Sequence, residues 1–270
     1  MTTSTPTSTR GLAVVTGASS GIGFELAKQF AQHDFDLIIA AEDDAIHAAA
    51  AELEALGGVS VEPAQVDLAA DGGVDELYRR ITGDGRPIEA VALNAGIGAG
   101  GAFAMDTALE DELRLIDLNV RSTVHLAKHV VRDMVDRDQG RILFTSSIAS
   151  TMPGAFQAVY NASKSFVQSF ALALRNELKD TQVTVTSLMP GPADTEFFER
   201  ADMLDTKVGA SEKDDPADVA RDGFDALMAG DERAVSASLA TKLQGRGSRL
   251  LPDSAKAALH RRMAEPGSGA

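Results

Sequence analysis

Short apolar runs alternate along this chain with longer segments in which apolar residues recur every three to four positions. The first run, Leu12–Thr16, is almost continuously apolar, as is typical of a strand buried on both faces of a sheet. In the segment that follows, Ile22, Leu26 and Phe30 fall on one face of a helix. Repetition of this unit is typical of βαβ folds, whose strands form a parallel sheet.

The same alternation continues to residue 236. Further strands are expected at Leu37–Ala41, Val59–Val61, Ile88–Leu93, Arg141–Thr145, Val183–Leu188 and Arg233–Ser236. Helices are expected at Ile22–His33, Ala45–Leu56, Val74–Ile81, Leu109–Val135, Phe156–Leu178 and Pro216–Met228. Two segments break the pattern: Thr195–Asp215, which we interpret as a mobile lid, and a tail that regains a helical pattern at Ser254–Met263.

The chain organisation is predicted to be simple. A length of 270 residues suits one α/β domain, and we see no internal repeat or long linker. We expect a disordered N-terminal tail over residues 1–10, one domain over residues 11–240 and a basic, partly helical C-terminal extension over residues 241–270. The predicted fold class is α/β, with a doubly wound parallel sheet.

Composition excludes several classes of function. The chain has no cysteine, which excludes disulfides, thiolate zinc sites and a cysteine nucleophile. Its net charge of −15 disfavours binding to nucleic acid or to anionic lipid. No stretch suits a membrane helix, and residues 1–9 lack the apolar core of a secretory signal. These features predict a cytoplasmic protein without stable membrane insertion.

A glycine-rich loop joins the first strand to the first helix. Glycines let the backbone turn sharply and approach a ligand, and a helix N-terminus offers free N–H groups to a pyrophosphate. A glycine turn without a ligand is the alternative, but the strand–loop–helix context favours a Rossmann-type dinucleotide site. The spacing is G-x-x-x-G-x-G, in the sequence Thr16-Gly17-Ala18-Ser19-Ser20-Gly21-Ile22-Gly23.

Acidic residues follow the second strand. In dinucleotide folds an acid at this position hydrogen-bonds the adenosine ribose, whereas a basic residue accommodates a 2′-phosphate. Here the strand runs into Glu42-Asp43-Asp44 with no Arg or Lys nearby. We therefore favour NAD over NADP, with Glu42 as the expected ribose contact. The alternative is that these carboxylates cap the helix that begins near Ala45.

Tyr160 and Lys164 are four residues apart at the start of a helix, so they share one helix face. Moving a hydride to or from a carbonyl carbon requires a proton at the oxygen, and a phenol with a pKa of about 10 is a poor base at neutral pH. A nearby ammonium, together with a cationic oxidised nicotinamide, lowers the pKa of such a phenol. The pair therefore predicts acid/base catalysis.

These motifs together resemble the short-chain dehydrogenase/reductase family, in its branch of about 250 residues with a TGxxxGIG loop and a YxxxK pair. The resemblance implies that Tyr160 is the catalytic acid/base and that Lys164 supports it and reaches the nicotinamide ribose. It also implies that Ser147 holds the substrate oxygen, with Ser146 as the adjacent alternative. Asn119 matches an asparagine that holds a water leading from Lys164 to solvent; an ordinary solvated helix position is the other interpretation.

Further matches to the family run in order from about Gly11 to about Ser236. They imply that Asp67, beside Leu68, contacts the adenine. They also imply that the nicotinamide carboxamide is bound by the segment containing Pro190, Gly191, Ala193 and Thr195. Asn94, Ala95 and Gly96 match a family motif after the fourth strand, although Leu93 stands where a first Asn is common.

The predicted function is hydride transfer between NAD(H) and a secondary alcohol or ketone. The alternatives are an NADP-dependent carbonyl reductase and a nonenzymatic nucleotide-sensing protein on the same fold. Substrate identity stays open, although the family positions suggest an apolar pocket formed by Met152, Phe156, Met189, Phe197 and Phe198. A serine hydrolase is excluded because Ser147 lacks the G-x-S-x-G surroundings of such a nucleophile.

Two remaining features concern metals and partners. His125 and His129 are spaced to bind a metal, but no third ligand is evident in the sequence, so no metal site is expected. The family resemblance implies a homodimer or homotetramer paired through Leu109–Val135 and Phe156–Leu178. The residues from Thr241 onward carry a net charge of about +4, and we favour their packing on a subunit over membrane contact.

Overall fold

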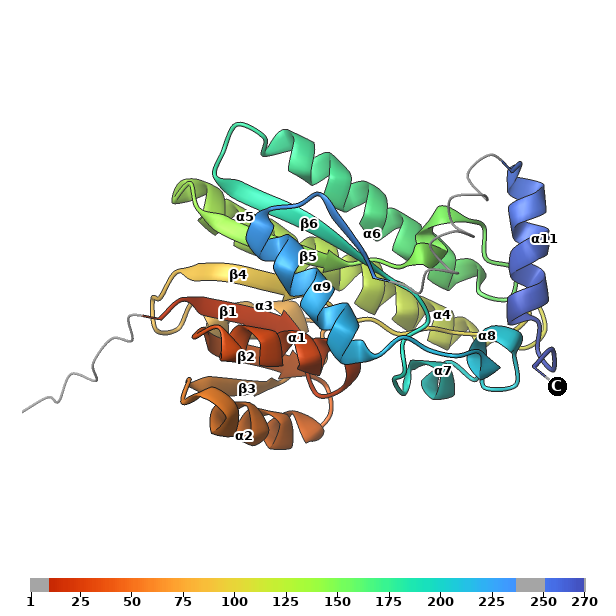
Figure 1. Ribbon diagram of the computed structural model, residues 1–270, viewed down its shortest axis with the longest axis horizontal. Helices are drawn as coiled ribbons and strands as arrows, with labels where there is room; N and C mark the ends of the chain where they lie inside the picture. Colours follow the sequence, from red (N-terminus) through yellow and green to blue (C-terminus); the bar gives the residue numbers. More distant parts are fainter. Residues whose placement is uncertain (1–9, 237–250, 270) are drawn as a thin grey trace, which may run out of the picture.

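The computed structural model describes residues 10–236 and 251–269. Within the first of these ranges, a seven-stranded parallel sheet has the strand order β3-β2-β1-β4-β5-β6-β7 (Figure 1). Its strands are β1 (Leu12–Thr16), β2 (Asp36–Ala41), β3 (Val61–Gln65), β4 (Ile88–Leu93), β5 (Gly140–Thr145), β6 (Val183–Pro190) and β7 (Arg233–Ser236). The strand order reverses between β1 and β4, which confirms the predicted doubly wound fold and places a crevice at the carboxyl ends of these strands.

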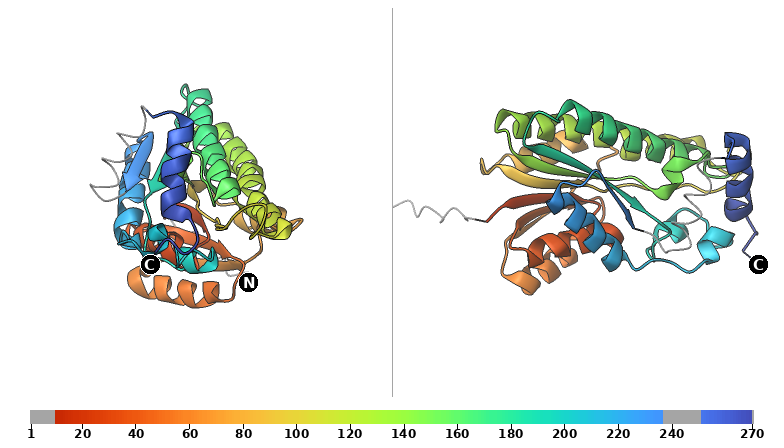
Figure 2. Two further views of the ribbon diagram at one scale, coloured as in Figure 1. Left: turned by 90° about the vertical axis from the view of Figure 1, so that its right-hand side faces the viewer. Right: turned by 45° about the horizontal axis from the view of Figure 1, so that its top comes forward.

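Helices cover both faces of this sheet (Figure 2). The helices of the described residues are α1 (Gly21–Gln32), α2 (Ala45–Gly57), α3 (Gly73–Ile81), α4 (Leu109–Ile116), α5 (Thr123–Asp136), α6 (Ala158–Glu177), α7 (Phe197–Arg200), α8 (Lys207–Ala210), α9 (Pro216–Ala229) and α11 (Asp253–Ala264). A π-helical turn, η1 (Asp117–Ser122), joins α4 to α5, and a short 3₁₀ helix, η2 (Ile148–Thr151), precedes α6.

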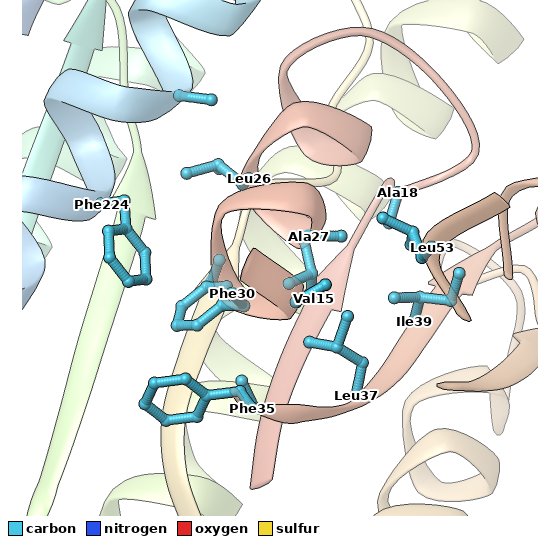
Figure 3. Close-up of a cluster of buried hydrophobic side chains, with 14 of the residues drawn as sticks. Val15, Ala18, Leu26, Ala27, Phe30, Phe35, Leu37, Ile39, Leu53 and Phe224 are labelled. Carbon is cyan, nitrogen blue, oxygen red and sulfur yellow. The ribbon is translucent and has the colours of Figure 1, made fainter. Parts of the chain in front are cut away.

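The core has one half on each face of the sheet. On one face α1, α2 and α9 pack on the strands, and Phe30 of α1 meets Phe224 of α9 edge to face at 5.1 Å (Figure 3). On the other face α3, α5 and α6 pack on the same strands. Val14 and Val15 are both fully buried because they point to opposite halves of the core, which explains why β1 is apolar up to Thr16.

The third strand differs from its prediction. It begins at Val61 and continues to Gln65, beyond the expected Val59–Val61. As the edge strand beside β2 it leaves Glu62 and Gln65 exposed and accommodates Pro63, so its residues do not form the continuous apolar run of a central strand.

The predicted helix Leu109–Val135 is interrupted at η1. Around this π-helical turn the hydroxyl of Ser122 donates to the Leu118 carbonyl at 2.5 Å, and that of Thr123 donates to the Asn119 carbonyl at 3.0 Å. These bonds occupy carbonyls of the interrupted turn. The predicted helix Phe156–Leu178 starts later, at Ala158, because Phe156 has a left-handed backbone with φ of 64°.

The segment predicted as a lid contains α7 and α8 and packs against the C-terminal helix. Phe198 and Met203 form a small buried cluster with Ala264 of α11. The mobility of this lid stays a prediction. The predicted tail over residues 1–10 lies outside the described residues except for Arg10, and so do residues 241–250 of the predicted extension. Among the described helices, none combines the length and apolarity needed to cross a bilayer.

Candidate active site

A cavity of about 300 Å³ opens at the carboxyl ends of the parallel strands. Its walls come from the glycine loop, the ends of β2, β4, β5 and β6, the first turns of α6, and α7 and α11. The structure brings nearly all the sequence-predicted site residues to this one lining: Gly17, Ser19, Ser20, Gly21, Ile22, Gly23, Glu42, Asp67, Leu68, Asn94, Ala95, Gly96, Ser147, Tyr160, Lys164, Pro190, Gly191, Ala193 and Thr195.

The glycine loop has the backbone that its sequence predicts. Gly17 and Gly21 adopt left-handed conformations, with φ of 66° and 56°. A Cβ at Gly23 would lie 1.9 Å from the Gly17 carbonyl oxygen, so no larger residue fits there. The loop therefore brings bare backbone to the cavity at the start of α1, where N–H groups can receive a pyrophosphate.

At one end of the cavity, Glu42 and Asp67 share a cation that the sequence analysis missed. Arg114 of α4 donates from Nη1 to Asp67 Oδ2 at 3.0 Å and from Nη2 to Glu42 Oε2. Asp67 Oδ1 also accepts from the Ala69 N–H at 2.9 Å. Arg114 is remote in sequence from both carboxylates, and no local motif marks it. The prediction that no basic residue lies near Glu42 is correct for its neighbours in the sequence. It is wrong for its neighbours in the folded structure.

At the same end of the cavity, one carboxylate oxygen of Asp43 accepts no hydrogen bond from the described residues. Its Oδ2 accepts a hydrogen bond from Ser19 Oγ at 3.0 Å, whereas its Oδ1 is buried without a hydrogen-bond partner among the described residues. The capping alternative gains no support, because Asp44 occupies the N-cap of α2 and makes no side-chain capping bond. A buried, unsatisfied carboxylate oxygen beside the glycine loop fits a ligand that brings a hydroxyl donor.

Asn94 ties together the ends of three strands. Its Nδ2 donates to the Thr16 carbonyl at 3.1 Å, and its Oδ1 accepts from Thr145 Oγ1 at 3.0 Å. The backbone N–H groups of Asn94 and Ala95 both donate to Thr16 Oγ1 at 3.0 Å. Asn94 thus fixes β1, β4 and β5 against one another and sets the shape of the cavity floor.

The two residues at the start of α6 face the middle of the cavity. Tyr160 and Lys164 are 8% and 6% exposed, and Lys164 Nζ lies 6.0 Å from the centre of the Tyr160 ring. Lys164 Nζ donates to the Thr145 carbonyl at 3.0 Å. A hydrogen bond links the Tyr160 hydroxyl to Ser147. Ser146, the alternative to Ser147, instead donates to the Lys164 carbonyl at 3.1 Å.

Burial dominates the ionisation of this pair. It raises the pKa of Tyr160 to about 12, and the hydrogen bond with Ser147 opposes that rise. Burial also lowers the pKa of Lys164 to about 8. The expected lowering of the phenol pKa is therefore not achieved by the protein's own groups, because desolvation of the buried phenolate outweighs its hydrogen bond with Ser147.

Asn119 lies behind the cavity and does not line it. Its Oδ1 accepts from the Ile97 N–H at 2.9 Å, and its Nδ2 donates to the Ile97 carbonyl at 2.9 Å and to Ser163 Oγ at 3.1 Å. Both polar atoms of this side-chain amide are hydrogen-bonded to protein groups, so Asn119 holds the loop after β4 in place. Its binding of a water beside Lys164 stays a prediction.

The other end of the cavity is mainly apolar. Of the residues expected to form a substrate pocket, Met152, Phe197 and Phe198 line the cavity, whereas Phe156 and Met189 do not. The helix α11 adds lining residues that sequence reasoning missed: His260, Met263 and Ala264. Its helical pattern was evident in the sequence, but nothing local showed where the helix packs.

Comparison with known proteins identifies the family. The family model for short chain dehydrogenases matches residues 11–204. This chain belongs to the short-chain dehydrogenase/reductase family. A short-chain type dehydrogenase/reductase of Sinorhizobium fredii, itself uncharacterised, is 35% identical over 190 residues, covering 70% of this chain and 73% of that protein. The NADP-dependent 3-hydroxy acid dehydrogenase of Salmonella typhi is 32% identical over 181 residues, covering 67% and 71%.

A solved structure extends the likeness to three dimensions. A short-chain dehydrogenase from Sphingobium yanoikuyae in complex with NADPH has a TM-score of 0.78 and 29% identity, covering 88% of this chain and 93% of that one. Our protein is thus an oxidoreductase of the short-chain dehydrogenase/reductase family that uses a nicotinamide dinucleotide. The backbone cradle at the glycine loop and the unsatisfied Asp43 oxygen both fit such a ligand.

Proposed function

We propose that this short-chain dehydrogenase interconverts a secondary alcohol and its ketone with NAD(H), and that Tyr160 exchanges the proton at the substrate oxygen. The observation that carries the proposal is the convergence of Ser147, Tyr160 and Lys164 on one cavity whose far end is the glycine loop. A bound nicotinamide supplies the hydride donor or acceptor. The protein supplies the orientation of the substrate and the path of the proton.

Each of the three side chains has a separate task. Ser147 presents its hydroxyl beside that of Tyr160, so the two can hold one substrate oxygen between them. The Tyr160 hydroxyl then gives its proton to that oxygen in reduction or removes it in oxidation. Lys164 places a positive charge next to the buried phenol, which offsets part of the cost of forming a phenolate there.

The simplest test is to replace Tyr160 with Phe. The ring and its packing remain, but the proton donor is lost, so we expect turnover to fall by at least a thousandfold. The affinity for NADH, measured by fluorescence titration, should change less than threefold. Retention of more than a tenth of the activity by this variant, with normal NADH binding, would refute the assigned role of Tyr160.

We further propose that NAD(H) is preferred over NADP(H). The unsatisfied Asp43 Oδ1 is suited to accept from a ribose hydroxyl, and Glu42 stands beside it. A 2′-phosphate would add negative charge next to both carboxylates. Arg114 does not offset this charge, because it already pairs with Glu42 and Asp67. The competing proposal is a preference for NADP(H), since the relative from Salmonella typhi is NADP-dependent.

Cofactor preference can be measured directly. The wild-type enzyme should bind NADH at least tenfold more tightly than NADPH. The substitution Glu42→Arg should shift that ratio toward NADPH by at least tenfold, since it exchanges repulsion of the phosphate for attraction. Glu52→Arg, on the exposed side of α2, makes the same charge change away from the cavity and should leave the ratio unaltered. Tighter binding of NADPH by the wild type would overturn this preference.

For the substrate, we propose a compound with an apolar portion next to its reacting carbon. Met152, Phe197, Phe198 and Met263 form an apolar wall near the catalytic residues. Arg200 also lines the cavity and pairs with Glu196 at 2.6 Å. That cation favours a hydroxy acid as the second candidate, because a substrate carboxylate could take the place of Glu196. A panel of matched alcohols with and without a carboxylate separates the two.

We also propose that the enzyme is a homo-oligomer. Leu109, Leu113 and Ile116 are 62%, 50% and 40% exposed and form one apolar stripe along α4. Phe166 of α6 is 42% exposed. Both elements belong to the long helical segments that the family resemblance assigns to subunit pairing. A second copy of this chain would cover the stripe.

A further inference from the structure

Away from the cofactor cavity, a carboxylate and two imidazoles converge between α3 and α5. Asp75 lies in the first turn of α3, whereas His125 and His129 are one turn apart on α5. Asp75 Oδ1 is 3.2 Å from His125 Nε2 and 3.6 Å from His129 Nε2. The three ligand atoms all lie within 4.8 Å of one another. The histidine pair is the motif that the sequence analysis set aside because no third ligand was evident.

These separations match the geometry of a bound transition metal. Zinc binds histidine nitrogen and carboxylate oxygen at about 2.0–2.2 Å with tetrahedral angles, which places adjacent ligand atoms roughly 3.4 Å apart. The two separations from Asp75 Oδ1 lie on either side of that value. The two imidazole nitrogens lie within 4.8 Å of each other, so rotation of these side chains would bring all three ligands around one ion. All three side chains are partly exposed, so water can supply a fourth ligand.

A neighbouring tyrosine holds one of the imidazoles in position. The Tyr78 ring stacks on His129, with ring centres 4.3 Å apart and planes 17° apart. The Tyr78 hydroxyl donates to Asp133 Oδ2 at 2.6 Å, which fixes the stacked ring against α5. Metal ligands are commonly oriented by such surrounding contacts, and a ligand that is already oriented loses less freedom when the ion binds.

We propose that Asp75, His125 and His129 form a binding site for a divalent transition ion, with zinc as the best match. Two imidazoles and one carboxylate suit Zn²⁺, Ni²⁺ or Cu²⁺ better than Mg²⁺ or Ca²⁺, which prefer oxygen ligands. None of the three residues lines the cofactor cavity, so the ion would have no part in the redox chemistry. It would join α3 to α5 and stabilise the helix that follows η1.

The test uses full-length protein, free of any affinity tag and treated with a chelator. Isothermal titration with Zn²⁺ at pH 7.5 should show one ion bound per chain. His129→Gln and Asp75→Asn should each weaken that binding at least tenfold. His47→Gln, which removes an exposed histidine on α2, should leave it unchanged. Thermal melts should show that saturating Zn²⁺ raises the Tm of the wild type by about 5 °C and that of His129→Gln by much less.

Several outcomes would overturn the proposal. Less than half an ion per chain in the wild type would mean that the three residues make only ordinary His–Asp hydrogen bonds. Unchanged affinity in His129→Gln would place the ion elsewhere. Unchanged affinity in Asp75→Asn would exclude the carboxylate and reduce the site to a histidine pair. Activity is not a readout here, so failure of the proposed redox function would leave this test unaffected.

Discussion

At the scale of single residues, Lys164 shows a conflict between stability and catalysis. The folded chain holds its ammonium in a buried position, and this burial lowers its pKa to about 8 from the 10.5 of an exposed lysine. One pKa unit corresponds to about 1.4 kcal/mol, so a charged Lys164 costs the folded state roughly 3 kcal/mol. The hydrogen bond to the Thr145 carbonyl recovers only about 1 kcal/mol of that.

Replacing Lys164 with Met should therefore stabilise the protein at pH 7 while abolishing turnover. We expect a gain of about 2 kcal/mol, or a rise in Tm of roughly 5 °C. Between pH 8 and 10.5 the unfolded wild type retains a proton that the folded wild type has lost, so wild-type stability rises with pH relative to the variant. The difference in Tm should accordingly shrink across that range, as measured by calorimetry. A variant less stable than the wild type at pH 7 would contradict this account.

Residues that belong to a local motif could be predicted, and those supplied from elsewhere in the chain could not. The glycine loop and the Tyr160–Lys164 pair line the cavity because turn and helix geometry fix their positions over a few residues. Arg114 reaches Glu42 and Asp67 only through the packing of α4, and Asp75 reaches its two histidines only through the packing of α3 on α5. No pattern along the sequence encodes such pairings.

At the scale of elements, the boundaries depend on how each element is buried. The bounds of the central strands β1 and β4 match their prediction to the residue, because strands covered on both faces are mostly apolar, with Glu89 and Thr16 as the polar exceptions. The edge strand β3 was misplaced because two of its five residues are exposed to solvent. The turn η1 could not be predicted from periodicity, since side-chain bonds to the backbone interrupt a helix whose apolar pattern continues.

The helix α11 gives this enzyme a wall of its active-site cavity. His260 Nδ1 is hydrogen-bonded to the Ala155 carbonyl at 2.9 Å, and Ala264 is buried against α7 and its flanks. The helix thus fixes the width of the apolar end. Here α11 packs on its own chain. The described part of the C-terminal extension therefore helps to form the cavity, a role that differs from the subunit contact expected from its charge.

Filling the cavity from α11 should change substrate selection without affecting the cofactor. Met263→Trp adds a large ring to the cavity that Phe197 and Phe198 also line, so the KM for bulky ketones should rise at least tenfold. The dissociation constant of NADH should stay within threefold of the wild-type value. Leu259→Trp, on an exposed part of the same helix, is the matched control and should leave both constants unchanged. Equal effects of the two variants would mean that α11 does not line the substrate site.

At the scale of the whole molecule, the sheet separates two surfaces. The cavity lies at the carboxyl ends of the strands. The helix α11 lies at this end too, whereas β1 begins at the opposite end (Figure 1). The apolar stripe lies on α4, and the exposed Phe166 lies on α6. Both helices belong to the same half of the molecule as α5. Covering this stripe leaves the substrate cavity free, because none of its residues lines the cavity.

A charge placed in this stripe should dissociate the oligomer. Leu113 is in the middle of the stripe, so Leu113→Glu would bury an unpaired carboxylate in each interface. We expect a penalty of about 3 kcal/mol, which corresponds to at least a hundredfold weaker association. Sedimentation should show a dimer or tetramer for the wild type and a folded monomer for the variant at micromolar concentration. Leu56→Glu introduces the same charge on α2 and should leave the assembly intact. A wild-type enzyme that is monomeric at that concentration would show that this stripe does not bind a second copy of the chain.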